Sequence, residues 1–288
     1  MGGVRPARAQ TMPTFAVDVR SVFIDAFVTR DRRPVAGLNA RNFELKDNGV
    51  RQIFDLVPAN SLPISTVLVF DTSASVYGAK LTRLQRAAGL LLEHLKPDDE
   101  AGLIAFSSKV LWLAPPSTDH EAVRRAVWAL SPSGATSLLD ALFSALILPK
   151  PASRPVIIVF SDGEDNMSFL DPAVVASAAR RSSALIYVVS APSEDFRSGP
   201  VSSAPAESAH TRTLRTIAAV TGGALIEAKT EAAIETAFTE IMASLTSRYV
   251  LKYAPEGAPA PGWHRLELRL TSGKGAVRAR DGYWVDPK

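Results

Sequence analysis

The sequence has no cysteine, few histidines and no long apolar run. Without cysteine the chain can form no disulfide, no thiolate nucleophile, no thiolate zinc site and no iron–sulfur cluster. Its four histidines do not form an H-x-x-x-H motif or any other metal-ligand spacing. Any metal ion that this chain binds is therefore expected to have oxygen ligands.

An excess of one charge is also missing, and no stretch reaches the roughly 20 apolar residues that a membrane-spanning helix needs. Thirty-two Lys and Arg stand against twenty-nine Asp and Glu, without a long basic run. We therefore expect no nucleic-acid partner and no membrane span. The 47% of hydrophobic and 21% of charged residues are typical of a folded protein with a substantial core.

Both ends of the chain predict β-structure. Asn48 and Gly49 form a pair that favours a tight type I′ hairpin turn. Alternating or apolar runs predict strands over residues 15–28, 43–47, 50–54, 249–253, 264–270 and 276–285. We interpret residues 14–62 together with 248–288 as one small β-sandwich. Residues 1–13 are predicted to be a leader or a disordered segment.

The middle of the chain alternates apolar strands with amphipathic helices. The predicted strands cover residues 66–70, 101–106, 156–160, 185–189 and 224–226. The predicted helices cover residues 81–95, 118–130, 136–148, 171–181, 213–221 and 231–245. Thr118 and Glu121 have the spacing of a capping box at the start of one of them. The fold class expected for residues 63–247 is α/β, a doubly wound, mostly parallel, Rossmann-like sheet inserted into the β-sandwich.

Oxygen-bearing side chains follow two of the apolar strands. Asp71, Ser73 and Ser75 form a D-x-S-x-S motif directly after one strand, and Asp162 follows another. Thr136 stands at the start of a predicted helix. Because open α/β sheets bind ligands at the carboxyl ends of their strands, these loops are expected to meet at one rim. Two carboxylates and three hydroxyls suit a hard divalent ion, Mg²⁺ above all, with Mn²⁺ or Ca²⁺ as substitutes.

At these residues the sequence resembles the von Willebrand factor type A (VWA) domain, over about residues 64–247. The metal ion-dependent adhesion site of that family consists of D-x-S-x-S, a distant Thr and a distant Asp. The resemblance implies hydroxyl ligands at Ser73, Ser75 and Thr136. It implies that Asp71 and Asp162 coordinate directly or through water. It also implies that an exposed Asp or Glu of a partner protein completes the coordination of the ion.

The flanking segments resemble a group of bacterial VWA-related proteins that generally carry export signals. The similar segments are residues 22–29, 34–38, 42–49, 248–253 and 277–283. Ala7, Arg8 and Ala9 also have the A-x-A form of a signal-peptidase site, although no apolar region precedes them. The resemblance therefore implies an exported protein, either periplasmic, at the cell surface or secreted.

Several residues near the rim have more than one interpretation. The D-x-S-x-S residues could be a turn with helix-capping side chains, since Asp and Ser favour both roles. Asp140 could support the site or be a surface carboxylate, and Glu164 and Asp165 could tune the site or be a solvated turn. The segment 191–209 could be a flexible insertion or a lid that contacts a partner. Alternating solvated faces account for Arg265, Arg269, Arg278 and Arg280 better than a basic stripe does.

The leading hypothesis is a non-enzymatic, Mg²⁺-dependent protein-binding or adhesion module. One alternative is a structural envelope protein that acts through the β-sandwich without metal. A second alternative is a Mg²⁺-dependent phosphatase-like hydrolase. It is disfavoured because Ser73 stands where such enzymes need a carboxylic general acid. The sequence does not indicate the oligomeric state.

Overall fold

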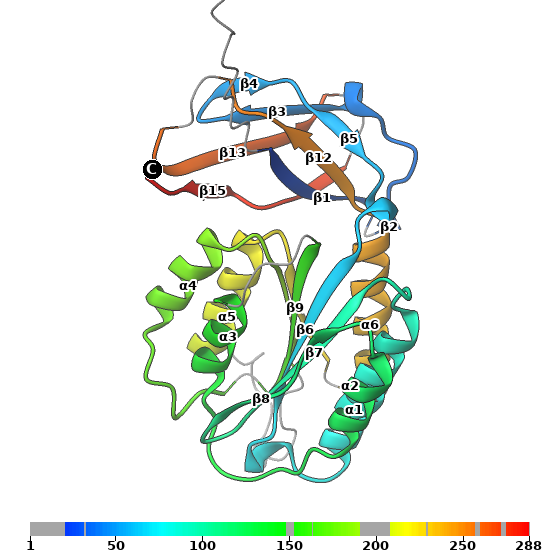
Figure 1. The fold of residues 1–288 in the computed structure, drawn as a ribbon, viewed down its shortest axis with the longest axis vertical. Helices are drawn as coiled ribbons and strands as arrows, with labels where there is room; N and C mark the ends of the chain where they lie inside the picture. The colour runs from blue at the N-terminus through cyan, green and yellow to red at the C-terminus, as the bar shows by residue number, and fades with distance from the viewer. Residues whose placement is uncertain are drawn as a thin grey trace, which may run out of the picture.

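The computed structural model describes residues 21–31, 33–147, 153–162, 164–190, 208–228, 230–256, 260–271 and 275–287. The predicted leader, the first part of the predicted strand 15–28 and most of the segment 191–209 lie outside the described residues. The described chain forms an α/β unit and a β-sandwich that lie end to end (Figure 1). None of the helices in this part of the chain is both long and apolar enough to cross a membrane.

A six-stranded sheet forms the centre of the α/β unit, in the order β11-β10-β9-β6-β7-β8. The strands are β6 (Ile64–Asp71), β7 (Glu100–Phe106), β8 (Val110–Ser117), β9 (Arg154–Ser161), β10 (Leu185–Ser190) and β11 (Ala224–Glu227). Strand β8 pairs antiparallel with β7, and the other pairs are parallel. Strand β8 was not predicted, because Pro115 and Pro116 argue against a strand except at a sheet edge, where it lies.

Helices cover both faces of this sheet. Helices α1 (Ala79–His94), α2 (His120–Trp128) and α6 (Glu231–Thr246) pack on one face, and α3 (Leu138–Leu146), α4 (Pro172–Arg181) and α5 (Ala209–Val220) pack on the other. Leu68 and Phe70 of β6 point to the first core, whereas Val67 and Val69 point to the second. Strand β6 is buried along its whole length, as its continuous apolar run predicts. The predicted doubly wound fold is confirmed.

Most helix starts differ from the prediction by one or more residues, and the capping side chains of α2 and α5 explain two of these differences. Asp119, not Thr118, caps α2, and its side chain accepts a hydrogen bond from the amide of Ala122 at 2.9 Å. The prediction of a capping box was therefore wrong, because Thr118 lies one residue before the residue that caps the helix. Helix α5 begins at Ala209, before the predicted residue 213, and the Ser208 side chain caps it by accepting from the amide of Thr211.

The β-sandwich combines strands from both ends of the chain. One sheet has the order β14-β1-β12-β5, with β2 beside β1, and the other has the order β15-β13-β3-β4. The strands are β1 (Val22–Arg30), β2 (Arg33–Pro34), β3 (Phe43–Asp47), β4 (Val50–Gln52), β5 (Asp55–Val57), β12 (Tyr249–Tyr253), β13 (Gly262–Leu270), β14 (Ala276–Arg278) and β15 (Gly282–Val285). Asn48 and Gly49 have φ of 47° and 84°, which confirms the hairpin turn.

A buried polar cluster lies inside the sandwich around Asp47. The hydroxyls of Tyr253 and Tyr283 donate to Asp47 at 2.8 and 2.7 Å, and His264 Nδ1 lies 2.8 Å from the same carboxylate. Burial raises the pKa of both tyrosine hydroxyls. The cluster joins strands from both ends of the chain, so His264 has a structural contact although its sequence context indicated no chemistry.

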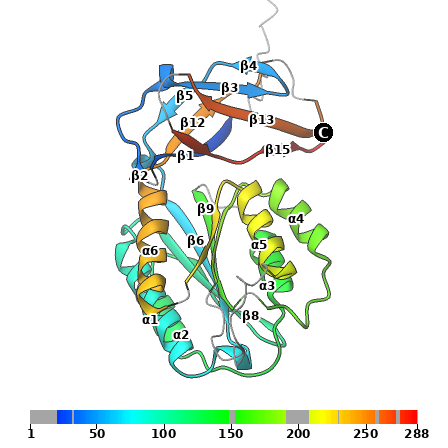
Figure 2. The ribbon, with the colours of Figure 1, turned by 180° about the vertical axis from the view of Figure 1, so that it is seen from behind.

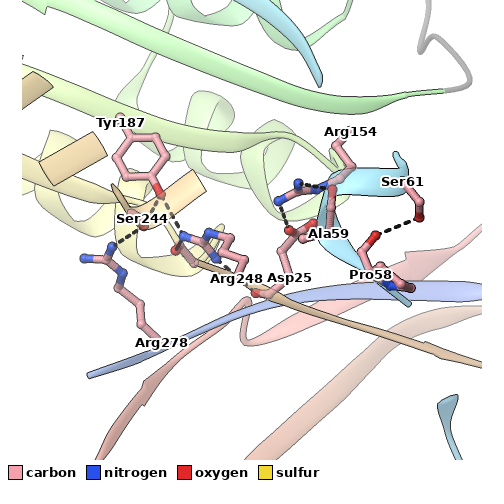
Figure 3. Close-up of polar contacts among 10 residues, drawn as sticks. Asp25, Pro58, Ala59, Ser61, Arg154, Tyr187, Ser244, Arg248 and Arg278 are labelled. Atoms are coloured by element: carbon pink, nitrogen blue, oxygen red, sulfur yellow. Dashed lines mark hydrogen bonds and ion pairs between the residues drawn. The ribbon is translucent and has the colours of Figure 1, made fainter. Parts of the chain in front are cut away.

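Arginine side chains join the sandwich to the α/β unit (Figure 3). Arg248 donates to the Tyr187 hydroxyl at 2.8 Å and to the Gly222 and Asp25 carbonyls at 2.7 and 3.1 Å. Arg154, at the start of β9, forms an ion pair with the Asp25 carboxylate on β1. Because a guanidinium presents several donors in a fixed plane, each of these side chains can satisfy groups from both units at once.

Two of the C-terminal arginines also belong to this junction. Arg280 donates to the carbonyls of Gly282 and Ser182 at 2.6 and 2.9 Å, and burial lowers the pKa of its guanidinium. Arg278 donates to the Ser244 hydroxyl on α6 at 3.1 Å. The prediction of solvated faces was therefore wrong for Arg278 and Arg280, because the opposing surface is protein and not water.

The sandwich packs against one end of the sheet. The amide of Arg154 donates to Pro63, so β9 and β6 begin beside the junction. Figures 1 and 2 show the carboxyl ends of the parallel strands at the opposite end of the α/β unit. The rim that the sequence singled out therefore points away from the sandwich.

Candidate metal centre

Asp71 is the last residue of β6 and is fully buried. Its Oδ1 accepts hydrogen bonds from the Ser73 amide at 2.8 Å and from the Ser73 hydroxyl at 2.6 Å. Its Oδ2 accepts from the Ser161 hydroxyl of β9 at 2.7 Å. Burial raises the pKa of the Asp71 carboxyl, against the lowering effect of these hydrogen bonds, and the charge of Asp162 raises it further.

The two serines of the motif lie together. Ser73 Oγ is 3.0 Å from Ser75 Oγ, and Ser75 lies in the short 3-10 helix η3 (Ala74–Val76). The D-x-S-x-S spacing therefore places two hydroxyls and one carboxylate in direct contact at the end of the central strand. This is a set of hard oxygen atoms, as the sequence predicted.

Asp162 follows β9 and is joined to this group by a lysine. Lys80 Nζ lies 3.2 Å from Asp162 Oδ2 and 3.5 Å from the Ser75 carbonyl oxygen. Both side chains are largely buried. Sequence analysis did not single out Lys80, although its place in the first turn of α1, soon after the motif, was a usable signal. The structure thus shows a cation beside one of the predicted carboxylate ligands.

Thr136 is buried on the neighbouring loop and is held there through its backbone. Its amide donates to Asn166 Oδ1 at 2.9 Å, and its carbonyl accepts from the amide of Met167 at 3.0 Å. The carbonyl of Gly134 accepts from the Ala74 amide at 3.0 Å, which ties this loop to the D-x-S-x-S loop. Gly134 has a φ of 81°, and a Cβ there would lie 2.6 Å from Ser108 Oγ, so the close approach requires glycine.

The five predicted ligands therefore differ in how closely the structure groups them. Asp71, Ser73 and Ser75 contact one another, Asp162 is connected to Ser75 through Lys80, and Thr136 belongs to a loop bonded to η3. In the part of the chain that the structure describes, no three His, Cys, Asp or Glu side chains gather as a metal site. A cation at this rim would therefore depend on the hydroxyl groups as well as on the two carboxylates.

The other rim carboxylates have structural contacts. Asp140 accepts hydrogen bonds from the Phe169 and Leu170 amides at 3.1 and 3.0 Å. Asp165 accepts from the Leu139 amide at 2.8 Å, which satisfies a free donor in the first turn of α3. These contacts disfavour a solvated turn for Asp165 and a free surface carboxylate for Asp140.

A family model described as von Willebrand factor type A domain matches residues 66–164. The match begins in β6 and ends just beyond Asp162, so it contains all five predicted ligands. The α/β unit is a von Willebrand factor type A domain. The resemblance found in the sequence is thus confirmed, and VWA domains are commonly protein-interaction modules.

Curated relatives share the VWA region with this chain. Inter-alpha-trypsin inhibitor heavy chain H4 of Bos taurus is 26% identical over 136 residues, which are 42% of this chain and 15% of that protein. A UPF0353 protein of Mycobacterium tuberculosis (strain ATCC 25177 / H37Ra) is 30% identical over 129 residues, which are 38% of this chain and 37% of that protein. The alignment thus spans well under half of the length of either relative.

A solved structure titled von Willebrand factor type A from Catenulispora acidiphila has a similar fold. It aligns with a TM-score of 0.52 and 13% identity, and the alignment covers 88% of this chain and 76% of that chain. At this identity the likeness shows the fold alone. It supports the VWA domain together with its additional β-rich region.

Proposed function

We propose that this protein is a Mg²⁺-dependent protein-binding module whose ion is held by Asp71, Ser73, Ser75, Thr136 and Asp162. The observation that carries the proposal is the direct contact of Asp71, Ser73 and Ser75 at the carboxyl end of the central strand. Their oxygen atoms are the hard ligands that Mg²⁺ prefers, and Mn²⁺ or Ca²⁺ would use the same donors.

The chain's own contacts orient these ligands. The Ser73 amide and the Ser161 hydroxyl donate to opposite oxygens of Asp71, so its carboxylate is fixed from the loop after β6 and from strand β9. Lys80 Nζ, by contrast, lies 3.2 Å from Asp162 Oδ2 and places a positive charge there that competes with a metal ion. Hydrogen bonds such as those to Asp71 orient the side chains that bind a metal ion. When bound, the ion supplies an electrophilic position that accepts one oxygen of a partner's carboxylate.

Charge supports an acidic partner. The carboxylates of Asp71 and Asp162 with the ammonium of Lys80 leave the site with one net negative charge. A divalent ion reverses this to one net positive charge, which an Asp or Glu of a partner protein would neutralise. We also propose an exported location for this interaction, because the flanking segments resemble bacterial VWA-related proteins that generally carry export signals.

Isothermal titration calorimetry of chelator-treated protein with Mg²⁺ and Mn²⁺ tests the proposal. We expect saturable binding by the parent protein and loss of binding in Asp71→Ala and Ser73→Ala. Ser144→Ala is the matched control, because its hydroxyl donates to a backbone carbonyl within α3, away from the proposed ligands. Circular dichroism would verify that each variant folds. No saturable binding by the parent, or full binding by both ligand variants, would contradict the proposal.

A further inference from the structure

The loop between β9 and α4, residues 164–171, is fixed to the rim at several points. The amide of Met167 donates to the Thr136 carbonyl at 3.0 Å. Two and three residues later, the amides of Phe169 and Leu170 donate to the two oxygens of Asp140. These contacts attach the loop to a predicted metal ligand on one side and to α3 on the other.

Side chains of the loop strengthen this attachment. The Leu139 amide, in the first turn of α3, donates to Asp165 Oδ2 at 2.8 Å and to Ser168 Oγ at 3.0 Å. The Ser168 hydroxyl donates to the same Asp165 oxygen at 2.7 Å. The helix start and the loop therefore satisfy each other's polar groups, which leaves the loop little freedom to rearrange.

The same loop presents large apolar side chains to solvent. Phe169 is 92% exposed and Met167 is 44% exposed. Tyr77, which follows η3 and the ligand Ser75, is 78% exposed. An aromatic side chain that stays exposed to water contributes little to the stability of the fold. Aromatic anchors of this kind on rigid backbone are typical of protein-binding surfaces, because little ordering cost remains to be met on binding.

We propose that Phe169, Met167 and Tyr77 form the apolar half of a docking surface whose polar half is the metal centre. The partner is a protein segment that carries a large apolar side chain close to the Asp or Glu that reaches the ion. The inference rests on the proposed function for that carboxylate. The backbone hydrogen bond between Met167 and Thr136 sets the spacing between the two halves of the surface. That spacing determines which acidic segments fit.

The probe is a phage-displayed library of random linear peptides, selected on the parent protein in millimolar Mg²⁺. We expect enriched peptides to combine Asp or Glu with a nearby aromatic or large aliphatic residue. Binding of one such synthetic peptide, followed by fluorescence anisotropy, should weaken on the order of tenfold in Phe169→Ser. Mg²⁺ binding by the same variant, measured by calorimetry, should not change, since the amide that donates to Asp140 is retained.

Ile53→Ser is the matched control. Ile53 is 83% exposed but lies next to β4 of the sandwich, at the other end of the molecule, so peptide binding should equal that of the parent. Peptide binding that requires Mg²⁺ and Asp71 but is unchanged in Phe169→Ser would overturn this inference and leave the proposed function intact.

Two further outcomes separate the inference from its basis. Peptide binding that requires Phe169 but persists in Asp71→Ala would overturn the metal-dependent function and keep Phe169 as a docking residue. A dimer of the parent protein that Phe169→Ser dissociates, measured by light scattering, would identify a second copy of the chain as the occupant. That result would overturn the acidic partner.

Discussion

The two ends of the VWA domain present opposite chemistry. At the end next to the sandwich, Arg248 and Arg280 direct buried guanidinium groups at backbone carbonyls. At the far end, carboxylates and hydroxyls of Asp71, Ser73 and Ser75 contact one another. One end is therefore rich in guanidinium donors that bond to other groups of the chain, and the other is rich in oxygen acceptors.

From this difference we expect a structural role for the end next to the sandwich and a binding role for the rim. A buried guanidinium that meets several carbonyls completes contacts between two parts of the same chain. At the rim, the clustered acceptors have the Lys80 ammonium beside them, next to Asp162. We therefore expect changes at the junction to affect the free energy of unfolding, and changes at the rim to affect binding.

Replacing Arg248 with Met should have the largest effect. The variant loses donors to the Tyr187 hydroxyl and to the carbonyls of Gly222 and Asp25, which then stay buried without them. We expect the free energy of unfolding, measured by urea denaturation, to fall by about 3 kcal/mol. The exposed Arg265 provides the control, and a loss in Arg248→Met no larger than in Arg265→Met would break the comparison.

Replacing Asp71 with Asn should remove Mg²⁺ binding while sparing the fold. We expect the affinity measured by calorimetry to fall by more than about a hundredfold, roughly 2.7 kcal/mol. Because burial raises the pKa of Asp71, its ionised form costs folding free energy at neutral pH, and Asn removes that cost. Urea denaturation without metal should therefore show a stability equal to or above that of the parent. A large destabilisation would mean that the rim is structural as well.

Replacing Asp140 with Ala should loosen the rim loop. The Phe169 and Leu170 amides lose their acceptors, so we expect about 1.5 kcal/mol of lost stability and faster amide hydrogen exchange at these two positions. Ser144→Ala, one turn along the same helix, should leave both exchange rates unchanged. Equal exchange in the two variants would show that Asp140 does not fix the loop.

Replacing Lys80 with Met should have the smallest effect and the opposite sign. Removing a positive charge 3.2 Å from Asp162 should raise the affinity for Mg²⁺ severalfold, which corresponds to about 1 kcal/mol of binding free energy. The reason is that the Lys80 ammonium no longer repels the metal ion. Lys80→Arg retains the charge and should resemble the parent in the same titration. An unchanged or weaker affinity in Lys80→Met would mean that Lys80 does not set the charge of the site.

Local sequence patterns were sufficient for most of the strands and most of the helices. The apolar run of β6 and the Asn48–Gly49 turn depend on neighbouring residues alone, so they were predicted correctly. Strand β8 was missed because its prolines are tolerated only at a sheet edge, and edge position is a property of the folded sheet. Helix starts shifted by a residue or more where several capping residues compete, as at Asp119.

The sequence by itself determined the doubly wound sheet and the position of the D-x-S-x-S motif after a buried strand, because periodicity and turn chemistry are local. Only the tertiary structure decided that Lys80 contacts Asp162 and that the 164–171 loop is bonded to Thr136. It also decided that Arg278 and Arg280 face protein. An alternating strand shows which residues share a face, but whether water or another part of the chain covers that face depends on packing between distant segments.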